Sequence, residues 1–463
     1  MTYRKLPPTM YSDVAPTPVR APRVLLFNDQ LAETLGLDPL VWNDPALLSG
    51  NTPPDDFAPL AEAYAGHQFG YLTMLGDGRA HLIQEVVTPT GERVDIQLKG
   101  SGRTPYSRGG DGRATLGPML REYLISEAMH ALGIPTSRSL AVVATGETVF
   151  RDDADTGAIL VRVAASHLRV GTLQYAAHQG VIREAADYAI ERHDPACRNA
   201  ANPYACFYGR VIERQADLIA AWQAVGFIHG VMNTDNMALS GETIDYGPCA
   251  FMDTYRADQV FSSIDRYGRY RYSHQPGIAK WNLARLGEAL IPLLAANKET
   301  AVQVANDTLD AFDTRFDAAW LERFGRKLGL PARPEDVPLI ERFLALLEAE
   351  KRDFTHTFRR LGDRPDENPF ASADGARWFA DWRRRVAVDG TPAEAAARMA
   401  AANPRVIPRN LPLEAALRAA ESGDLLPFRD MLAAVQTPFA ADVPAAYTEP
   451  PADDAPFVTY CGT

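Results

Sequence analysis

Polar and apolar residues alternate over much of the first third of the chain, as they do in half-buried strands. Arg93–Lys99 alternates in this way. Tyr71–Met74 and residues 80–86 flank the glycine-containing stretch 75–79, and this arrangement predicts two strands paired through a turn. Further strands are expected between residues 139 and 165.

One helix is expected among these strands, and many helices after them. Pro118 stands at the start of the first helix, and Gly133, with Pro135 beyond it, stands at its end. Residues 210–225 show a strong amphipathic pattern with the period of a helix. Further helices are predicted at 279–295, 300–328, 339–361, 393–402, 414–420 and 426–435.

The pattern divides the chain into four parts. Residues 1–60 are Pro-rich and weakly periodic, which predicts an extended arm laid over a folded body. Residues 61–170 have the pattern of strands with one helix, and residues 171–436 that of helices, so we expect an α+β protein. Residues 437–463 are rich in Pro, Ala and Asp and are expected to form a tail with little secondary structure.

Composition and charge narrow the classes of function. The hydrophobic fraction of 46% and the charged fraction of 23% are ordinary for a soluble globular protein. The net charge of −12 argues against a broad nucleic-acid-binding surface. No run of 18 apolar residues occurs, so no membrane span is expected. The N-terminal residues lack an apolar signal core, and the expected location is the cytoplasm.

The four cysteines are spread along the chain, at Cys197, Cys206, Cys249 and Cys461. None of them forms a C-x-x-C pair, which argues against a structural zinc site.

Residues 229–247 carry the clearest chemical pattern, because they resemble the catalytic and metal-binding loops of protein kinases. His229 and Asn236 have the kinase spacing, and Asp245 opens an Asp-Tyr-Gly where kinases have Asp-Phe-Gly. Val231 occupies the position of the kinase catalytic Asp, while Asp235 directly precedes Asn236. An amide oxygen and a carboxylate are suitable ligands for Mg²⁺. We therefore expect a site that binds a nucleotide with its metal ion.

Lys99 and the residues after it suggest a phosphate-binding segment. Lys99 ends a strand, as the phosphate-binding lysine of a kinase does. Residues 99–113 hold five glycines and four basic side chains. Glycines let backbone N–H groups approach phosphate closely, and arginines donate to it in pairs. A flexible surface loop with a solvated lysine is the alternative interpretation.

Charged residues among apolar neighbours complete the candidate site. The helix after the loop carries Glu122 and Glu127, which lie about 140° apart around the helix. We expect Glu122 to pair with Lys99, while a solvated or capping role stays open for either glutamate. Arg162 lies in an apolar strand-like run, where an unpaired charge is costly, and is expected to bind a carboxylate or a phosphate.

Three long motifs together resemble the selenoprotein O family of pseudokinase-like protein adenylyltransferases. They are residues 64–70 (Tyr-Ala-Gly-His-Gln-Phe-Gly), 97–140 and 229–247, and the resemblance extends to a cysteine near the C-terminus. It implies a protein-kinase-like bilobal fold with a β-rich N-lobe, a helical C-lobe and extensions at both ends. The lobes would correspond to residues 61–170 and 171–436.

The resemblance also implies a reaction. ATP would bind in a flipped orientation, and AMP would pass to a Ser, Thr or Tyr hydroxyl of a client protein with release of pyrophosphate. Asp235 would accept the proton, and Asn236 and Asp245 would bind Mg²⁺, or Mn²⁺ in its place. The nucleotide pocket would comprise Gly76, Gly78, Arg79, Lys99, Asp111, Gly112, Arg162, Arg169 and Asp245, with Glu122 beside the lysine.

The sequence departs from the family pattern at its cysteines. The tail reads Cys461-Gly462-Thr463, whereas many members end in Cys or selenocysteine followed by two serines. Residues 260–264 contain serines where some members have a cysteine. Cys461 is expected to be a free thiol, and the alternative is a bridge to Cys249 that would tie the tail across the site. Two other functions also stay open, an atypical protein kinase and a non-catalytic nucleotide-binding scaffold.

Overall fold

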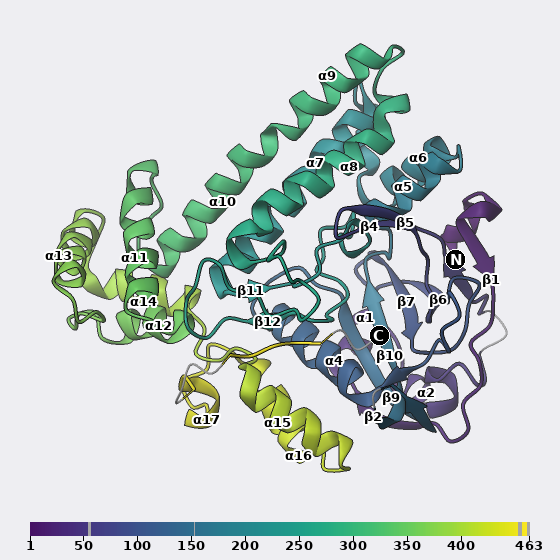
Figure 1. Cartoon of the computed structure of the whole chain (residues 1–463), viewed down its shortest axis with the longest axis horizontal. Helices are drawn as coiled ribbons and strands as arrows, with labels where there is room; N and C mark the ends of the chain where they lie inside the picture. The colour runs from purple at the N-terminus through teal and green to yellow at the C-terminus, as the bar shows by residue number, and fades with distance from the viewer. Residues whose placement is uncertain (54–56, 152, 452–455, 461–463) are drawn as a thin grey trace.

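A large antiparallel sheet forms one side of the molecule, and helices form the rest (Figure 1). The computed structural model describes residues 1–53, 57–151, 153–451 and 456–460. The sheet has eight strands in the order β1-β3-β6-β7-β10-β9-β2, with β8 paired to β10, and the α+β class is confirmed. Its strands are β1 (Tyr11–Asp13), β2 (Arg23–Phe27), β3 (Leu60–Glu62), β6 (Ala80–Val87), β7 (Arg93–Lys99), β8 (Ala114–Thr115), β9 (Arg138–Phe150) and β10 (Ala154–Ala164).

The centre of this sheet positions the polar residues of the site. β7 lies between β6 and β10, and its register sets Gln97 opposite Arg162 and Lys99 opposite Leu160. The helix expected after the glycine-rich loop is α4 (Leu116–Ala131), which is buried over most of its length and packs against β9 and β10. Burial of both the strands and the helix makes any charge between them costly unless it is paired.

The prediction for residues 71–86 was wrong in its pairing. Tyr71–Met74 is a strand, β5, but its partner is β4 (Ala65–Gln68), and the two form a separate hairpin. The hairpin turns at Phe69 and Gly70, whose φ angles of 50° and 94° fit a tight two-residue turn. Strand β6 pairs instead with β3 and β7.

The expectation of an extended N-terminal arm was also wrong. Strands β1 and β2 form the two ends of the sheet order, and three short helices lie between β2 and β3. Asn28, Asp38 and Asp44 cap these helices by accepting hydrogen bonds from their first N–H groups. The capping residues were the sequence signal for this structure. The helices are α1 (Asp29–Leu35), α2 (Pro39–Trp42) and α3 (Pro45–Leu48).

Residues after 170 are mainly helical, as predicted, but two long helices are divided. The predicted helix 300–328 breaks at Asp310, and the predicted helix 339–361 breaks before Asp353, which caps the second part. The helices are α5 (Val170–His178), α6 (Ile182–His193), α7 (Pro203–Val225), α8 (Gln275–Leu294), α9 (Lys298–Leu309), α10 (Ala311–Lys327), α11 (Val337–Ala349), α12 (Phe354–Asp363), α13 (Ala373–Val388), α14 (Pro392–Ala402), α15 (Asn410–Glu421) and α16 (Leu426–Val435).

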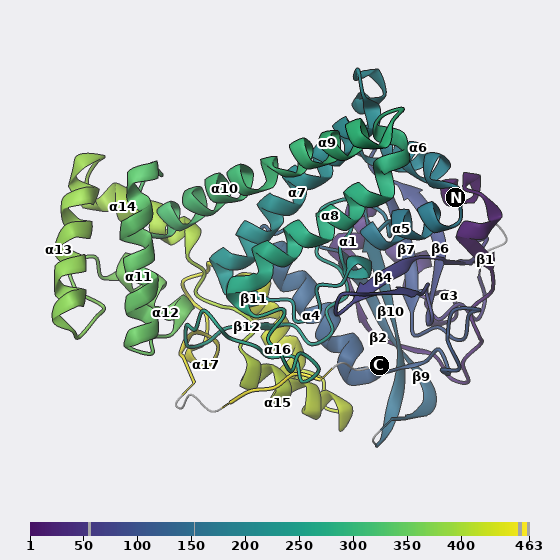
Figure 2. The same ribbon diagram turned by 45° about the horizontal axis from the view of Figure 1, so that its top comes forward.

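Helices α7, α8 and α10 run beside one another between the sheet and the outlying helices α11–α14 (Figure 2). Helix α13 has no counterpart among the helices predicted from the sequence. In the part of the chain that the structure describes, no helix has the length and apolar character that a membrane span requires.

The C-terminal tail runs beside the segment that follows the Asp-Tyr-Gly motif. Thr459 forms a parallel bridge with Ser262, and its hydroxyl donates to the carbonyl oxygen of Pro248 at 2.7 Å. The only regular helix in the described part of the tail is α17 (Ala445–Thr448), in agreement with the prediction of little secondary structure. Cys249 is buried, and the expected alternatives for Cys461 concern a residue outside the described ranges.

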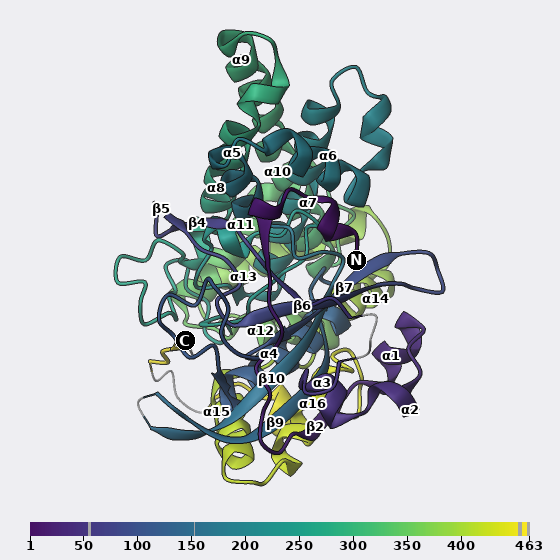
Figure 3. The same ribbon diagram turned by 90° about the vertical axis from the view of Figure 1, so that its right-hand side faces the viewer.

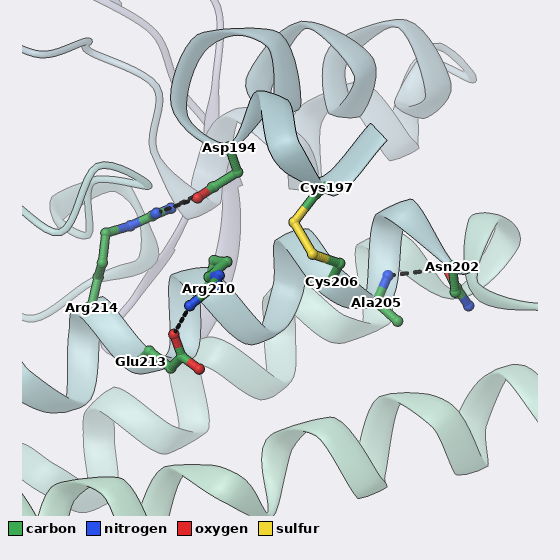
Figure 4. The surroundings of a disulfide bond; sticks show 8 residues. All are labelled: Asp194, Cys197, Asn202, Ala205, Cys206, Arg210, Glu213 and Arg214. Atoms are coloured by element: carbon green, nitrogen blue, oxygen red, sulfur yellow. Dashed lines mark hydrogen bonds and ion pairs between the residues drawn. A yellow bond between two sulfur atoms is a disulfide. The ribbon is translucent and has the colours of Figure 1, made fainter. Parts of the chain in front are cut away.

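A disulfide bond between Cys197 and Cys206, which was not predicted, joins a short 3₁₀ helix to the first turn of α7 (Figure 4). Beside it, the guanidinium group of Arg214 binds the carboxylate of Asp194 at 2.8 Å. Arg214 also donates to the carbonyl oxygen of Leu239, within the loop of residues 229–247. Because the N–H of Cys197 donates to the carbonyl oxygen of Asp194 at 2.8 Å, three successive contacts link the disulfide to that loop.

Candidate active site

The loop of residues 229–247 is held at both ends. It begins after β11 (Phe227–Ile228), which pairs with β12 (Ala250–Phe251) shortly after the loop ends. Inside the loop, the imidazole of His229 is hydrogen-bonded to the carbonyl oxygen of Ile244 at 3.0 Å. This contact fixes the backbone directly before the Asp-Tyr-Gly motif.

Asp245 is the centre of the charged cluster. Its Oδ1 accepts hydrogen bonds from Lys99 at 2.8 Å and from Arg162 at 2.5 Å, and its Oδ2 accepts from Arg169 at 2.6 Å. Its φ of 61° is rare for a residue with a side chain. Burial alone would raise the pKa of Asp245, but Arg162, Lys99 and Arg169 outweigh it and keep the pKa well below its ordinary value. Asp245 is therefore a carboxylate at any physiological pH.

Lys99 pairs with the first of the two candidate glutamates. Its ammonium group lies 2.6 Å from Glu122 Oε2, while Glu127 pairs with Arg138 and accepts from Asn28. Arg162 reaches the same Glu122 at 3.3 Å. The carboxylate partner expected for Arg162 is thus present, and a second cation shares it.

Arg169 connects the cluster to the catalytic loop. The backbone around it pairs with residues 237–239, and its guanidinium group donates to the carbonyl oxygen of Asp235 at 2.7 Å. The same group stacks on the ring of Tyr64, 4.5 Å from its centroid. Tyr64 belongs to the first of the three long sequence motifs, so this motif lies at the same site.

Asp235 is buried, and its Oδ1 has no hydrogen-bond partner among the described residues. Gly66 makes room for it, because a Cβ at Gly66 would lie 2.1 Å from Asp235 Oδ1. Burial, opposed mainly by Arg169, raises the pKa of Asp235 to about 6. A buried carboxyl with an unused oxygen and a raised pKa is suited to accept a proton from a substrate.

A divalent cation fits the donor atoms of this loop. The amide nitrogen of Asn236 donates to the carbonyl oxygen of Val231 at 2.9 Å, which leaves the amide oxygen as the ligand atom. Asp245 supplies a carboxylate, and both are hard oxygen donors of the kind that Mg²⁺ prefers. Among the described residues no group of three or more His, Cys, Asp or Glu side chains could hold a metal ion. A metal at Asn236 and Asp245 would therefore depend on oxygen atoms of a ligand for the rest of its coordination.

The glycines that we expect to contact the nucleotide lie in two chain segments, residues 75–79 and 99–113, which pack against each other. A Cβ at Gly76 would lie 2.4 Å from the ring of Tyr106, and a Cβ at Gly112 would lie 2.1 Å from the backbone of Gly102. The carbonyl oxygen of Arg79 accepts from the N–H of Gly100. A Cβ at Gly78 would lie 3.0 Å from the backbone carbonyl oxygen of residue 106.

Asp111 is the candidate that the structure does not bring to the charged cluster. Both of its carboxylate oxygens accept from Arg151 at 2.9 Å, at the end of the β9–β10 hairpin. This ion pair lowers the pKa of Asp111 to about 2. Contact of Asp111 with a nucleotide stays a prediction.

Residues 133–140, at the end of the second motif, support the metal loop through hydrogen bonds. The N–H of Thr243 donates to the carbonyl oxygen of Pro135, and the N–H of Ser137 donates back to Thr243. The hydroxyls of Thr136 and Tyr246 are hydrogen-bonded to each other. The sequence analysis predicted neither these contacts nor the close approach of Gly66 to Asp235. A glycine in the middle of a strand was the signal for that close approach.

The chain is similar to proteins of one family over its whole length. The family model "Protein adenylyltransferase SelO" matches residues 1–436. Proteins named "Protein nucleotidyltransferase YdiU" from Geobacillus kaustophilus and Halalkalibacterium halodurans are 54% and 52% identical to it, over 100% of this chain and 98% and 96% of theirs. The protein of the same name from Rhizobium etli is 51% identical, over 100% of this chain and 96% of its own. With this similarity over the whole chain, the protein belongs to the SelO family of protein adenylyltransferases.

Proposed function

We propose that this enzyme transfers AMP from ATP to Ser, Thr or Tyr hydroxyl groups of client proteins. The acceptor oxygen forms a bond to the α-phosphorus, and the bond from that phosphorus to the oxygen bridging the β-phosphate breaks. Pyrophosphate leaves with the electrons of that bond, and the proton of the hydroxyl passes to Asp235. The acceptor hydroxyl groups belong to proteins, in agreement with the names of the relatives and of the family.

Three buried cations support binding of the triphosphate. Lys99, Arg162 and Arg169 converge on one carboxylate, Asp245. Glu122 also pairs with Lys99 and Arg162, and Asp77 lies 3.9 Å from Arg169. Three cations therefore meet at a single carboxylate. Phosphate oxygens would supply further acceptors at this point, and the two arginines can each donate in pairs to them.

The place of Asp235 supports AMP transfer over phosphoryl transfer. Val231 stands where a kinase has its base, and its apolar side chain has no group that could accept a proton. Asp235 lies on the side of the loop that faces Gly66. A flipped nucleotide would set its α-phosphate, instead of its γ-phosphate, beside this carboxyl, as the family resemblance implies.

The proposal includes Mg²⁺, or Mn²⁺, at Asn236 and Asp245, where a bound ion would neutralise charge that develops on the phosphates. It also includes a kinase-like two-lobed arrangement, with lobes at residues 61–170 and 171–436 between an N-terminal and a C-terminal extension. As part of the same proposal, the enzyme acts in the cytoplasm on ATP and proteins, and on neither nucleic acids nor membranes.

The observation that carries the proposal is the convergence of Lys99, Arg162 and Arg169 next to a loop that has Asp235 in place of the kinase base. ATP labelled at the α- or the γ-phosphate tests it. We expect α-label on protein and γ-label in pyrophosphate. Transfer of γ-label to protein would establish a kinase, and binding of ATP without transfer of either label would establish a scaffold.

A further inference from the structure

One edge of the β4–β5 hairpin, on β4, contacts the catalytic loop. The backbone N–H of His67 donates to Thr234 Oγ1 at 2.7 Å, and the N–H of Phe69 donates to Asn233 Oδ1 at 3.1 Å. Both acceptors directly precede Asp235 in the sequence. The outward-facing N–H groups of β4 are thus used to hold the loop that carries the proposed base.

The other edge of the hairpin, on β5, has free backbone groups. The N–H of Leu75 donates to the carbonyl oxygen of Tyr64, and this bond fixes which residues of the hairpin bond to each other. In an antiparallel pair, hydrogen-bonded and non-hydrogen-bonded residue pairs alternate. Leu72 and Met74 therefore direct their N–H and C=O groups away from β4. Within the described residues this sheet has two strands only, and no strand pairs with β5 on that side.

The edge of β5 is apolar and unprotected. Tyr71, Leu72 and Met74 are 80%, 50% and 39% exposed. Proteins usually protect such an edge with a charge, a proline or a bulge, and β5 (Tyr-Leu-Thr-Met) has none of these. Figure 3 shows β5 at the margin of the molecule, beside the loops that precede α8. The edge is thus open to an extended chain.

A cation stands at the turn of the hairpin. The guanidinium group of Arg269 lies 3.8 Å from the position that a Cβ on Gly70 would take. It stacks on Trp281, 4.9 Å from the ring centroid, and this contact keeps it beside the turn. No carboxylate of the described residues forms an ion pair with Arg269. The end of the β5 edge is therefore complementary to an acidic side chain.

We propose that an extended, acidic segment of the client protein pairs with β5 as a third strand. Leu72 and Met74 supply the backbone hydrogen bonds, and Arg269 binds a carboxylate of the segment. An extended backbone fits this edge, because the free N–H and C=O groups of β5 recur with the period of a strand. The inference rests on the proposed AMP transfer and names how its protein substrate is recognised.

This docking brings the client close to the chemistry. Gly66 of β4 touches Asp235, and neighbouring strands lie about 4.8 Å apart, so a strand added to β5 runs roughly 10 Å from Asp235. That distance is covered by about three residues of extended chain. The modified hydroxyl is then carried by residues that flank the paired segment.

Dephosphorylated casein is a suitable probe, because it is unfolded, acidic and rich in hydroxyl groups. Its equilibrium binding is measured by thermophoresis, and its labelling is measured with α-labelled ATP. We expect Leu72→Pro, which removes an outward N–H, to raise the Kd and KM for casein about 5–10-fold, the loss of one or two hydrogen bonds. Leu72→Ala keeps the N–H and is expected to change them less than 3-fold. Equal effects of the two substitutions would overturn strand pairing.

Arg269→Glu tests the charge without altering the hairpin backbone. We expect it to weaken casein binding at low salt and to lose that effect at high salt. Casein with amidated carboxyl groups should bind the wild type as weakly as unmodified casein binds the variant. Arg384→Glu, an equally drastic change on the exposed and remote helix α13, is the matched control and should alter nothing. Unchanged casein binding by Arg269→Glu would overturn the acidic segment.

Two further measurements separate this inference from the proposed function. The affinity of each variant for ATP, by calorimetry, should equal that of the wild type, which shows that the hairpin still supports the catalytic loop. If the wild type binds casein through β5 but transfers α-label to no protein, the docking is correct and the proposed function is wrong. If it labels folded proteins and does not bind casein, the docking is wrong and the proposed function is correct.

Discussion

Two buried ionic clusters in this molecule are arranged around centres of opposite charge, a carboxylate in one and a guanidinium group in the other. At the candidate active site, three cations surround Asp245, and two of them share Glu122 as well. In the second cluster, the single guanidinium group of Arg409 binds both Asp253 and Asp353. One cluster is therefore centred on a carboxylate and the other on a cation.

The second cluster is a structural junction. Arg409 precedes α15, Asp353 caps α12 by accepting from the N–H of His356, and the side-chain amide of Asn410 donates to the carbonyl oxygen of Phe251. The same amide also donates to the carboxylate of Asp253 at 3.4 Å, so backbone and side-chain donors both use the carboxylates of this cluster. The active-site cluster instead contacts the backbone of Asp235 through Arg169, and the side-chain Oδ1 of Asp235 has no partner among the described residues. The comparison indicates that the cluster suited to a ligand is the one next to a polar atom that the protein itself does not use.

Asp245→Ala is expected to give the largest effect, loss of transfer to background. The substitution removes the only full negative charge of the proposed metal pair and leaves three buried cations without their common partner. Transfer of α-label is the measurement. Asp353→Ala, which removes a carboxylate from the other cluster, is the control and should keep the activity of each folded molecule. Near wild-type labelling by Asp245→Ala would refute the metal assignment.

Asp235→Ala should lower turnover by about 10²–10⁴-fold, the usual contribution of a general base. ATP affinity should stay within about 3-fold of the wild type, because Asp235 contacts Arg169 only through its backbone oxygen. Single-turnover labelling and calorimetry measure the two quantities. A loss of ATP affinity at unchanged turnover would make Asp235 a binding residue and place the base elsewhere.

Arg409→Ala should act on stability and not on chemistry. Removing one partner of a buried ion pair costs about 3–5 kcal/mol, since it leaves the other charge uncompensated. Here two carboxylates lose their cation, one of which caps α12. Urea unfolding measures the loss, and the rate of transfer per folded molecule should equal that of the wild type. A fully stable variant with impaired transfer would contradict the assignment of this cluster to structure.

Local pattern accounts for most of the elements and for the residues of the site, because strands, amphipathic helices and the 229–247 motif are each contained in short segments. Pairings between segments that are distant in the sequence were harder to predict. The partner of Tyr71–Met74 depends on the tight turn at Phe69 and Gly70, and the alternative turn at 75–79 had equally good local residues. The Arg409 junction joins residues that are 56 and 156 positions apart, so no local pattern contains it.

Helix caps explain the other misses. Asp353 interrupts a continuous apolar pattern by capping α12, and Asn28, Asp38 and Asp44 begin short helices in a Pro-rich segment. A capping side chain competes with the hydrophobic period and prevails where the backbone N–H groups would otherwise be unpaired. The choice of Glu122 over Glu127 as partner of Lys99 followed from the sequence only as a preference, since both glutamates are buried and paired.

Lys99→Ala should weaken ATP binding by about 10–100-fold, which corresponds to one charged hydrogen bond to phosphate. The effect is smaller than that of Asp245→Ala because Arg162 and Arg169 remain. Calorimetry with ATP gives the affinity, and Lys280→Ala, which removes a lysine from an exposed ion pair on α8, is the matched control. An unchanged affinity would favour a lysine that serves only to neutralise Glu122 and Asp245.

Lys327 offers the smallest and most selective test, because it is a buried cation that pairs with no carboxylate among the described residues. It lies at the end of α10, 4.2 Å from the ring centroid of Phe358 and 5.3 Å from that of Phe354, and burial lowers its pKa to about 7. The unfolded chain keeps this lysine protonated up to its ordinary pKa of 10.5, so between pH 7 and 10.5 the unfolded state binds more protons and stability rises with pH.

Lys327→Met removes this pH-dependent contribution to the free energy of unfolding. We expect the variant to gain on the order of 1 kcal/mol at pH 6, where the wild type pays for a buried charge, in line with the gains seen when buried ions are replaced by apolar groups. The gain should shrink as the pH rises from 7 towards 10, and transfer should not change. Urea unfolding of both proteins across this range measures the difference. A gain that does not depend on pH would contradict the lowered pKa and would mean that the ammonium group of Lys327 stays protonated in the folded protein.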